Sequence, residues 1–211
     1  MTINWYGQSC FRVESKGVSL LFDPFSKEIG LRAPRLNDNI FLVTHEHYDH
    51  NNAKDVPSEA FVIHGPGEYE KSGIYVEGIP SFHDNAQGAE RGLNTIYAVR
   101  IEDMRLCHMG DFGQAKLTDE QIEAIGDIDV LFIPVGGKYT INGSEAADIV
   151  REIEPKIVIP MHYKIPDLNM DIEGPQKFLK EMGIKPEEVE TLRIAKKTLP
   201  QEEIKLVIFK L

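Results

Sequence analysis

The stretch that decides the fold runs from residue 40 to residue 50 and reads Ile40-Phe41-Leu42-Val43-Thr44-His45-Glu46-His47-Tyr48-Asp49-His50. Its first half is a short, continuously apolar run, which is typical of a buried strand. Its second half places imidazoles and a carboxylate directly after that strand, where the backbone is held rigidly. The stretch therefore predicts a strand that ends at a metal site.

The spacing His45-x-His47-x-Asp49-His50 favours two metal ions over one. These side chains cannot all reach a single tetrahedral ion unless the chain bends sharply, whereas two adjacent ions can take alternate members of the group. Nitrogen and oxygen ligands of this kind suit divalent transition metals. We expect two divalent metal ions, with Zn²⁺ as the default and Mn²⁺ or Fe²⁺ as the alternatives.

The bulk composition is that of an ordinary globular protein. The chain has 211 residues, of which 42% are hydrophobic and 27% charged, so it can fill one apolar core. No repeat, low-complexity tract or linker divides it, and we expect a single domain over residues 1–211. The two cysteines, Cys10 and Cys107, form no Cys-x-x-Cys pair and give neither a disulfide framework nor a cysteine zinc module.

The charge of the chain limits its partners. A formal net charge of -11 repels phosphate backbones and anionic lipids, so we expect a small-molecule substrate and neither nucleic acid nor membrane. A homo-oligomer stays open. No segment approaches the roughly 18 consecutive apolar residues of a membrane span, and the N-terminus lacks the pattern of a signal peptide. A cytoplasmic location is expected.

The rest of the chain predicts an α/β fold, because a strand-rich first half is followed by alternating strands and helices. Residues 25–39 have no clear period and are either a mobile loop beside a site or an ordinary surface loop. The motif Thr118-Asp119-Glu120-Gln121 predicts a capping box at the start of a helix. The predicted strands cover 3–6, 10–14, 18–22, 40–44, 60–63, 74–79, 95–101, 130–135, 156–160 and 204–209, and the predicted helices 118–125, 144–153 and 174–182.

The histidine-rich stretch and three later segments resemble the pattern of metallo-β-lactamase-fold hydrolases. The first matches the His-x-His-x-Asp-His signature, and the later matches are His83, Gly110-Asp111 and His162. The resemblance covers essentially the whole chain. It implies an αβ/βα four-layer sandwich, in which two mixed β-sheets are flanked by helices.

A narrower similarity links the chain to a compact subgroup of that superfamily. It is carried by His64-Gly65-Pro66-Gly67-Glu68-Tyr69 and by His108-Met109-Gly110-Asp111. In these stretches the chain is similar to ascorbate-6-phosphate lactonases and to N-acylphosphatidylethanolamine phospholipase-like enzymes.

The superfamily resemblance also implies a set of metal ligands. His45, His47 and His83 would hold one ion, Asp49, His50 and His162 the other, and Asp111 would bridge the two. His64 also ends a predicted strand and is the alternative to His83, whereas His108 is expected to pack or to support the site. Asp23 resembles the buried aspartate beneath the family's metal site, where it would accept the free ring N–H of a ligating histidine.

The implied function is metal-dependent hydrolysis of an ester, lactone, amide or phosphodiester bond by a hydroxide held between the two metals. Asp49 and Asp111 would be the catalytic carboxylates, one orienting the nucleophile and the other bridging the ions. Loops that flank the ligands supply the candidate substrate contacts Lys138, Tyr139 and Tyr163, with similar claims for Arg91, Asn94 and Lys164.

Two other functions stay open on the same fold: a metal-binding or scaffold protein without turnover, and a phosphodiesterase or nuclease of the superfamily. A di-iron redox enzyme is disfavoured, because relatives of that kind carry Glu where this chain has His47.

Overall fold

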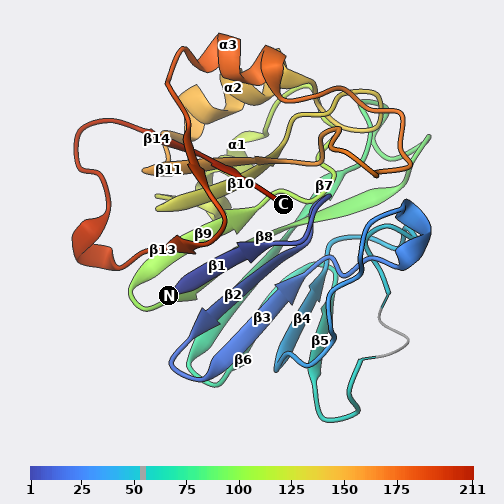
Figure 1. The fold of residues 1–211 in the computed structure, drawn as a ribbon, viewed down its shortest axis with the longest axis vertical. Coiled ribbons are helices and arrows are strands. Elements are labelled where there is room, and N and C mark those ends of the chain that lie inside the picture. The colour runs from blue at the N-terminus through green and yellow to red at the C-terminus, as the bar shows by residue number, and fades with distance from the viewer. Residues whose placement is uncertain (53–55) are drawn as a thin grey trace.

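The computed structural model describes residues 1–52 and 56–211, and within them the strands form two mixed sheets that enclose a common core (Figure 1). The smaller sheet has six described strands. Its strand order is β13 (Leu192–Arg193), β1 (Thr2–Trp5), β2 (Phe11–Ser15), β3 (Val18–Phe22), β4 (Ile40–Val43) and β5 (Phe61–His64). The pairs from β13 to β3 are antiparallel, and β3, β4 and β5 run parallel to one another.

The larger sheet has eight described strands. Its order is β12 (Glu187–Val189), β14 (Lys205–Phe209), β11 (Ile157–Met161), β10 (Val130–Pro134), β9 (Met104–His108), β8 (Leu93–Ile101), β7 (Ile74–Phe82) and β6 (Gly67–Lys71). The pairs from β12 to β9 are parallel, and those from β9 to β6 are antiparallel. The strands β7, β9, β10 and β11 therefore all point the same way.

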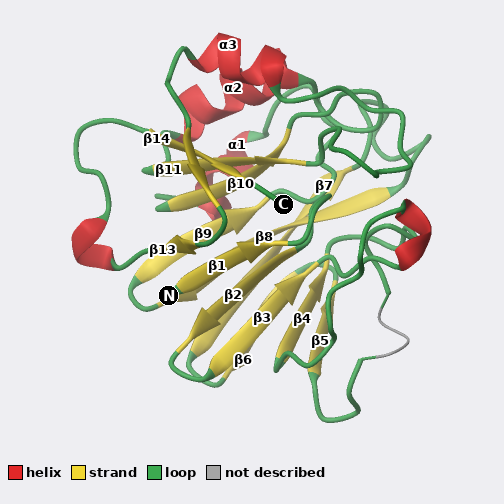
Figure 2. Cartoon of the chain, viewed as in Figure 1, coloured by secondary structure: helices red, strands yellow, loops and turns green. Residues whose placement is uncertain are grey.

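The α-helices in the described part of the chain lie along the larger sheet (Figure 2). They are α1 (Asp119–Ile125), α2 (Gly143–Ile153) and α3 (Gln176–Met182). The predicted capping box is confirmed, since the Thr118 hydroxyl accepts from the Gln121 N–H and the Gln121 side chain reaches back to the Thr118 N–H. None of the described helices has the length and apolar character that crossing a bilayer requires.

The main core lies between the sheets, where both contribute aromatic rings. Phe11 of the smaller sheet packs on Phe132 of the larger one, with ring centroids 4.5 Å apart, and both rings are fully buried. Burying a side chain of this size stabilises the fold by roughly 1.5–3 kcal/mol. The expected architecture of two mixed sheets flanked by helices is confirmed.

A second, smaller core covers the outer face of the six-stranded sheet. There Phe41 packs with Phe25 and Ile29, which are buried although they lie in the aperiodic segment 25–39. Ile29 ends a short 3-10 helix, Lys27–Ile29. This segment is therefore a structural cover for the sheet rather than a simple surface loop.

The topology brings the ends of several distant strands to one place. β3 is followed by Asp23, β4 by Thr44 and His45, β7 by His83, β9 by Gly110-Asp111 and β11 by His162. The strands of each sheet that carry these residues run parallel, so their carboxyl ends meet at one edge of each sheet. The fold therefore gathers the residues that the sequence pattern singled out.

Candidate metal centre

The strand ends place the histidines and aspartates in two adjoining clusters. In each cluster, every residue offers one nitrogen or oxygen atom that lies within 4.8 Å of those of its neighbours. The first cluster comprises His45, His47 and His83, and the second comprises Asp49, His50, Asp111 and His162. These are the seven side chains of the predicted ligand set.

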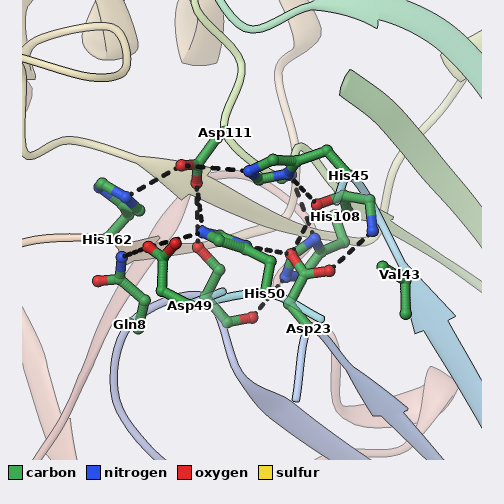
Figure 3. A network of polar contacts seen from close by, with 12 residues as sticks. Gln8, Asp23, Val43, His45, Asp49, His50, His108, Asp111 and His162 are labelled. Carbon is green, nitrogen blue, oxygen red and sulfur yellow. Dashed lines mark hydrogen bonds and ion pairs between the residues drawn. The ribbon is translucent and has the colours of Figure 1, made fainter. Parts of the chain in front are cut away.

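Asp111 lies between the clusters and faces both of them (Figure 3). Its Oδ2 atom is 3.1 Å from His162 Nε2, 3.2 Å from His83 Nε2 and 3.9 Å from His45 Nε2. Its Oδ1 atom is 3.2 Å from His50 Nε2. A carboxylate in this position could serve both clusters, because it lies within 3.2 Å of histidines from each of them.

Several buried ring nitrogens in the clusters make no well-formed hydrogen bond with the described residues, although two of them, His50 Nε2 and His162 Nε2, lie 3.2 and 3.1 Å from oxygens of the Asp111 carboxylate. The whole set is His45 Nε2, His50 Nε2, His83 Nδ1 and both ring nitrogens of His162. A buried polar atom without a partner costs about 1–3 kcal/mol, so this many in one place need another explanation. Imidazole nitrogens are preferred ligands of zinc and related ions, and the donor set fits such ions.

The carboxylates of the second cluster have the charge state that ligands need. Burial acts to raise the pKa of Asp111, but His162 and His50 outweigh burial and hold this pKa well below its ordinary value. The pKa of Asp49 is lowered in the same way, with His50 as the main cause that opposes burial. Both carboxyl groups are therefore ionised at neutral pH, as metal binding requires.

The histidines divide into two electrostatic types. Burial lowers the pKa values of His45 and His47, and the charges of neighbouring histidines lower them further, so these rings are neutral. His50 is the opposite case: burial lowers its pKa, but Asp111 and the other nearby carboxylates raise it well above the ordinary value. The carboxylates around His50 attract positive charge, and a metal cation would meet the same demand.

Asp23 and Thr44 fix the orientation of two of these rings. The fully buried Asp23 carboxylate is 2.9 Å from His50 Nδ1 and accepts hydrogen bonds from both the N–H and the hydroxyl of Thr44, each 2.8 Å long. The Thr44 hydroxyl also lies 2.9 Å from His45 Nδ1. With the Nδ1 side engaged, the Nε2 atoms of both rings face the clusters, which is the arrangement predicted for Asp23.

Two supporting residues were not predicted from the sequence. The Gln8 amide donates a 2.9 Å hydrogen bond to Asp49 Oδ2, and the Ser9 hydroxyl lies 3.5 Å from Asp111 Oδ1. Both side chains are buried. The sequence offered only a polar turn, Gly7-Gln8-Ser9, between two predicted strands. Such a turn is equally typical of a plain strand connection.

The backbone around the site is unusual. Gln8, Asp23 and His162 have φ values of 54°, 43° and 50°, a left-handed region that non-glycine residues enter at a cost of order 1 kcal/mol or more. Gly110 is required beside Asp111, because a Cβ atom there would lie 2.3 Å from the Asn94 side chain. Gly136 is required because its Cβ would lie 2.1 Å from the His162 carbonyl oxygen.

The remaining two histidines lie outside both clusters. His64 is exposed and pairs with the Glu46 carboxylate at 3.1 Å. His108 is buried against Phe22, its Nε2 donates to the Ser9 carbonyl, and its Nδ1 accepts from the Gly110 N–H. The structure therefore brings His83, and not His64, to the clusters, and gives His108 the supporting position expected for it.

A cavity of about 560 Å³ opens onto the clusters. Of the candidate substrate contacts, Tyr139 and Arg91 line it. Tyr163 does not: it is buried, and its ring packs 5.2 Å from the ring of Trp5. Lys138 pairs with the carboxylate of Asp171, a residue of the cavity wall.

The other two candidates have structural hydrogen bonds. Asn94 is buried and donates to the Ser81 hydroxyl and to the Met109 carbonyl. The Lys164 ammonium donates to the carbonyls of Leu168 and Met170. Both side chains therefore support loops around the cavity.

Comparison with known proteins gives consistent results for the sequence and the fold. Residues 2–162 match the beta-lactamase superfamily domain. A UPF0173 protein of Pyrococcus furiosus is 33% identical in an alignment that covers 86% of this chain and 90% of that protein. A UPF0173 metal-dependent hydrolase of Pyrococcus horikoshii is 30% identical in an alignment that covers 97% of this chain and 99% of that protein.

The fold also matches a crystal structure from Thermotoga maritima, described as a candidate zinc-dependent hydrolase of the metallo-β-lactamase superfamily. The TM-score is 0.81 at 32% sequence identity, covering 99% of this chain and 97% of that one. The narrower similarity to lactonases and phospholipase-like enzymes stays a prediction. The chain belongs to the metallo-β-lactamase superfamily and, within it, to the UPF0173 family of metal-dependent hydrolases.

Proposed function

We propose that the chain is a hydrolase with two metal ions that cleaves an ester, lactone, amide or phosphodiester bond in a small molecule. The observation that carries this proposal is the set of buried imidazole nitrogens around the ionised Asp111 carboxylate that make no well-formed hydrogen bond with any described residue. His45, His47 and His83 would hold one ion, Asp49, His50 and His162 the other, and Asp111 both. Zinc is the first candidate because the donors are nitrogen and oxygen atoms.

When bound, two such ions would supply a water activated at neutral pH and would polarise the substrate oxygen. The chain's own residues do the rest. Gln8 holds Asp49 by one carboxylate oxygen, so that the other can orient a nucleophile. The cavity of about 560 Å³ offers room for a small molecule beside the clusters, with Tyr139 in its wall.

The same geometry favours an enzyme that acts on a small molecule over a metal-binding scaffold without turnover. A purely structural metal site is usually closed by its ligands, whereas these clusters face a cavity that a substrate can enter. No feature of the described residues favours a nuclease in particular, and the net charge of -11 disfavours one.

The proposal is tested by elemental analysis of the purified protein together with assays on three model compounds: bis(4-nitrophenyl) phosphate, a γ-lactone and 4-nitrophenyl acetate. We expect close to two transition-metal ions per chain and turnover that a chelator abolishes and added metal restores. Two ions without turnover on a broad ester, lactone, amide and phosphodiester panel would favour the scaffold role. No bound metal after reconstitution would overturn the metal site itself.

A further inference from the structure

Arg91 occupies a central position around the metal clusters. Three hollows, of about 560, 410 and 370 Å³, surround this part of the surface, and Arg91 lines all three. Among the described residues that line the largest hollow, it is the lone arginine or lysine. Some histidines and aspartates of both clusters, among them His47 and Asp111, line the same hollow.

Arg91 also differs from the nearby lysines in how little it is engaged. Lys138 is paired with Asp171, and Lys164 donates to two backbone carbonyls. Among the residues that the structure describes, the Arg91 guanidinium has one weak polar contact, a 3.5 Å pair with the exposed side chain of its neighbour Glu90. An exposed pair of this kind contributes little, so the guanidinium is free to take another anion.

The backbone that carries Arg91 is nevertheless fixed, and it is tied directly to the metal-site strand. Asp84, the residue after His83, is buried and accepts four backbone N–H groups from residues 86, 88, 90 and 91. The bond from the Arg91 N–H is 2.7 Å long. A buried carboxylate therefore holds the loop in place while the long side chain of Arg91 stays adjustable.

The charges of the cavity point to an anionic ligand. Its described carboxylates are Asp49, Asp111 and Asp171, and two divalent cations in the clusters would more than neutralise them. Arg91 would then add its charge to a site that is already positive, although the whole chain is strongly acidic. Such a local field attracts anions into the cavity.

We propose that Arg91 receives an anionic oxygen group of the substrate, a carboxylate or a phosphate, located beside the bond that is cut. The guanidinium matches either group because its planar N–H donors can bind two oxygens at once. Tyr139 and Met170 form the less polar part of the same wall, next to the anion-binding end. This inference rests on the proposed hydrolase function and narrows its substrate class.

The test compares Arg91→Met with the wild type and with Arg100→Met. Arg100 lies in β8 near the opposite end of the larger sheet and stacks on Tyr75, so its replacement removes the same charge far from the clusters. Binding of phenylphosphonate and of benzoate to the metal-loaded proteins is measured by calorimetry, with metal content checked in each. Hydrolysis is compared for 4-nitrophenyl acetate and for its anionic analogue, mono-4-nitrophenyl succinate.

We expect Arg91→Met to keep its metals and to bind at least one probe ten-fold or more weakly, while Arg100→Met binds like the wild type. A larger loss for phenylphosphonate would assign a phosphate, and a larger loss for benzoate a carboxylate. Arg91→Met should also prefer mono-4-nitrophenyl succinate over 4-nitrophenyl acetate less strongly than the wild type does, because its KM for the succinate is higher.

Unchanged anion binding in a fully metal-loaded Arg91→Met protein would overturn the inference while leaving the hydrolase proposal intact. Conversely, Arg91-dependent anion binding in a protein that hydrolyses no ester, lactone, amide or phosphodiester would support the anion site and count against the hydrolase.

Discussion

Each end of the larger sheet contains a buried carboxylate, but the two carboxylates have different partners. At the amino end of β10, the carboxylate of Asp129 is fully engaged: Lys156 lies 2.7 Å away, Lys196 2.9 Å, and the Arg105 backbone N–H donates at 2.9 Å. At the carboxyl ends of β9 and β11, Asp111 lies 3.1–3.2 Å from histidine nitrogens, and several buried nitrogens of these rings make no well-formed hydrogen bond within the described part of the chain.

This difference separates a structural polar cluster from a functional one. The Asp129 end also has a cavity, of about 430 Å³, and several charged residues in its wall. Neither a cavity nor a buried charge therefore identifies a site. What distinguishes the Asp111 end is a set of buried histidine nitrogens that make no well-formed hydrogen bond with the described residues, grouped around an ionised carboxylate.

The largest contrast is expected between Asp111→Ala and Asp129→Ala. The first should lose at least one metal ion per chain and reduce hydrolysis by roughly a thousand-fold or more, which corresponds to about 4 kcal/mol in the barrier. The second should keep its metals, because its partners are lysines and a backbone N–H. Elemental analysis of both variants is the measurement, and unchanged metal content in Asp111→Ala would contradict the bridging position.

A second contrast lies within the histidines. His83→Ala should lose metal, since His83 Nε2 is 3.2 Å from the Asp111 carboxylate and its ring is buried. His64→Ala should keep its metals, because His64 is exposed and paired with Glu46. The same elemental analysis applies, and the reverse result would transfer the ligand position to His64.

Gln8→Leu tests whether the hydrogen bond that holds Asp49 contributes to metal binding. The amide donates to Asp49 Oδ2, and removal of such a partner typically weakens metal binding about 10–100-fold. Competition with a coloured chelator measures the affinity. Gln121→Leu is the matched control: this glutamine completes the capping box of α1 and bonds Gln114 and Pro80 but none of the cluster residues, so its loss should lower stability without changing metal affinity. Equal metal affinity in Gln8→Leu and wild type would make Gln8 a purely structural residue.

The smallest expected effect is the pH dependence of the stability that Asp129 contributes. Burial acts to raise the pKa of Asp129, but hydrogen bonds from Lys156 and Lys196 outweigh it and hold the pKa below its ordinary value. A lowered folded-state pKa gives stabilisation that is present above the unfolded-state pKa of about 3.9 and is lost as pH falls through the folded-state value.

The wild type should therefore exceed Asp129→Asn by about 1–2 kcal/mol in unfolding free energy at pH 7, a modest figure because both lysines are partly exposed. Below about pH 4 the gap should shrink. Urea unfolding at several pH values measures it. A gap that stays constant down to pH 3 would show that the lysines do not act through the charge of Asp129.

The sequence predicted most of the fold because the apolar periods are strong. The strand at 18–22 has the predicted bounds, and the helices predicted at 118–125 and 144–153 begin and end within one residue of α1 and α2. β9 was missed because it is short, contains Arg105 and follows β8 through the tight turn at Glu102-Asp103, where both residues have positive φ. β12 and β13 span three and two residues, too few for any period.

The candidate ligands could be read from the sequence because their chemistry lies in residue type and order. The supporting Asp23 was also predicted, through the resemblance, but Gln8 and Asp84 were not, because they act through contacts that leave no recognisable pattern in the sequence. Tyr163 shows the converse limit: it follows His162 directly, but its ring turns into the core against Trp5. Adjacency in sequence did not give access to the cavity.

The position of Asp111 between the clusters has a mechanical consequence. His45, His47, Asp49 and His50 follow a strand of the smaller sheet, whereas His83, Asp111 and His162 follow strands of the larger one. Metal ions bound by both groups would cross-link the two halves of the molecule without a covalent bond. Such a cross-link closes long loops of the chain and so restricts the conformations of the unfolded state. Loss of the ions would then weaken the link between the two sheets as well as disabling the site.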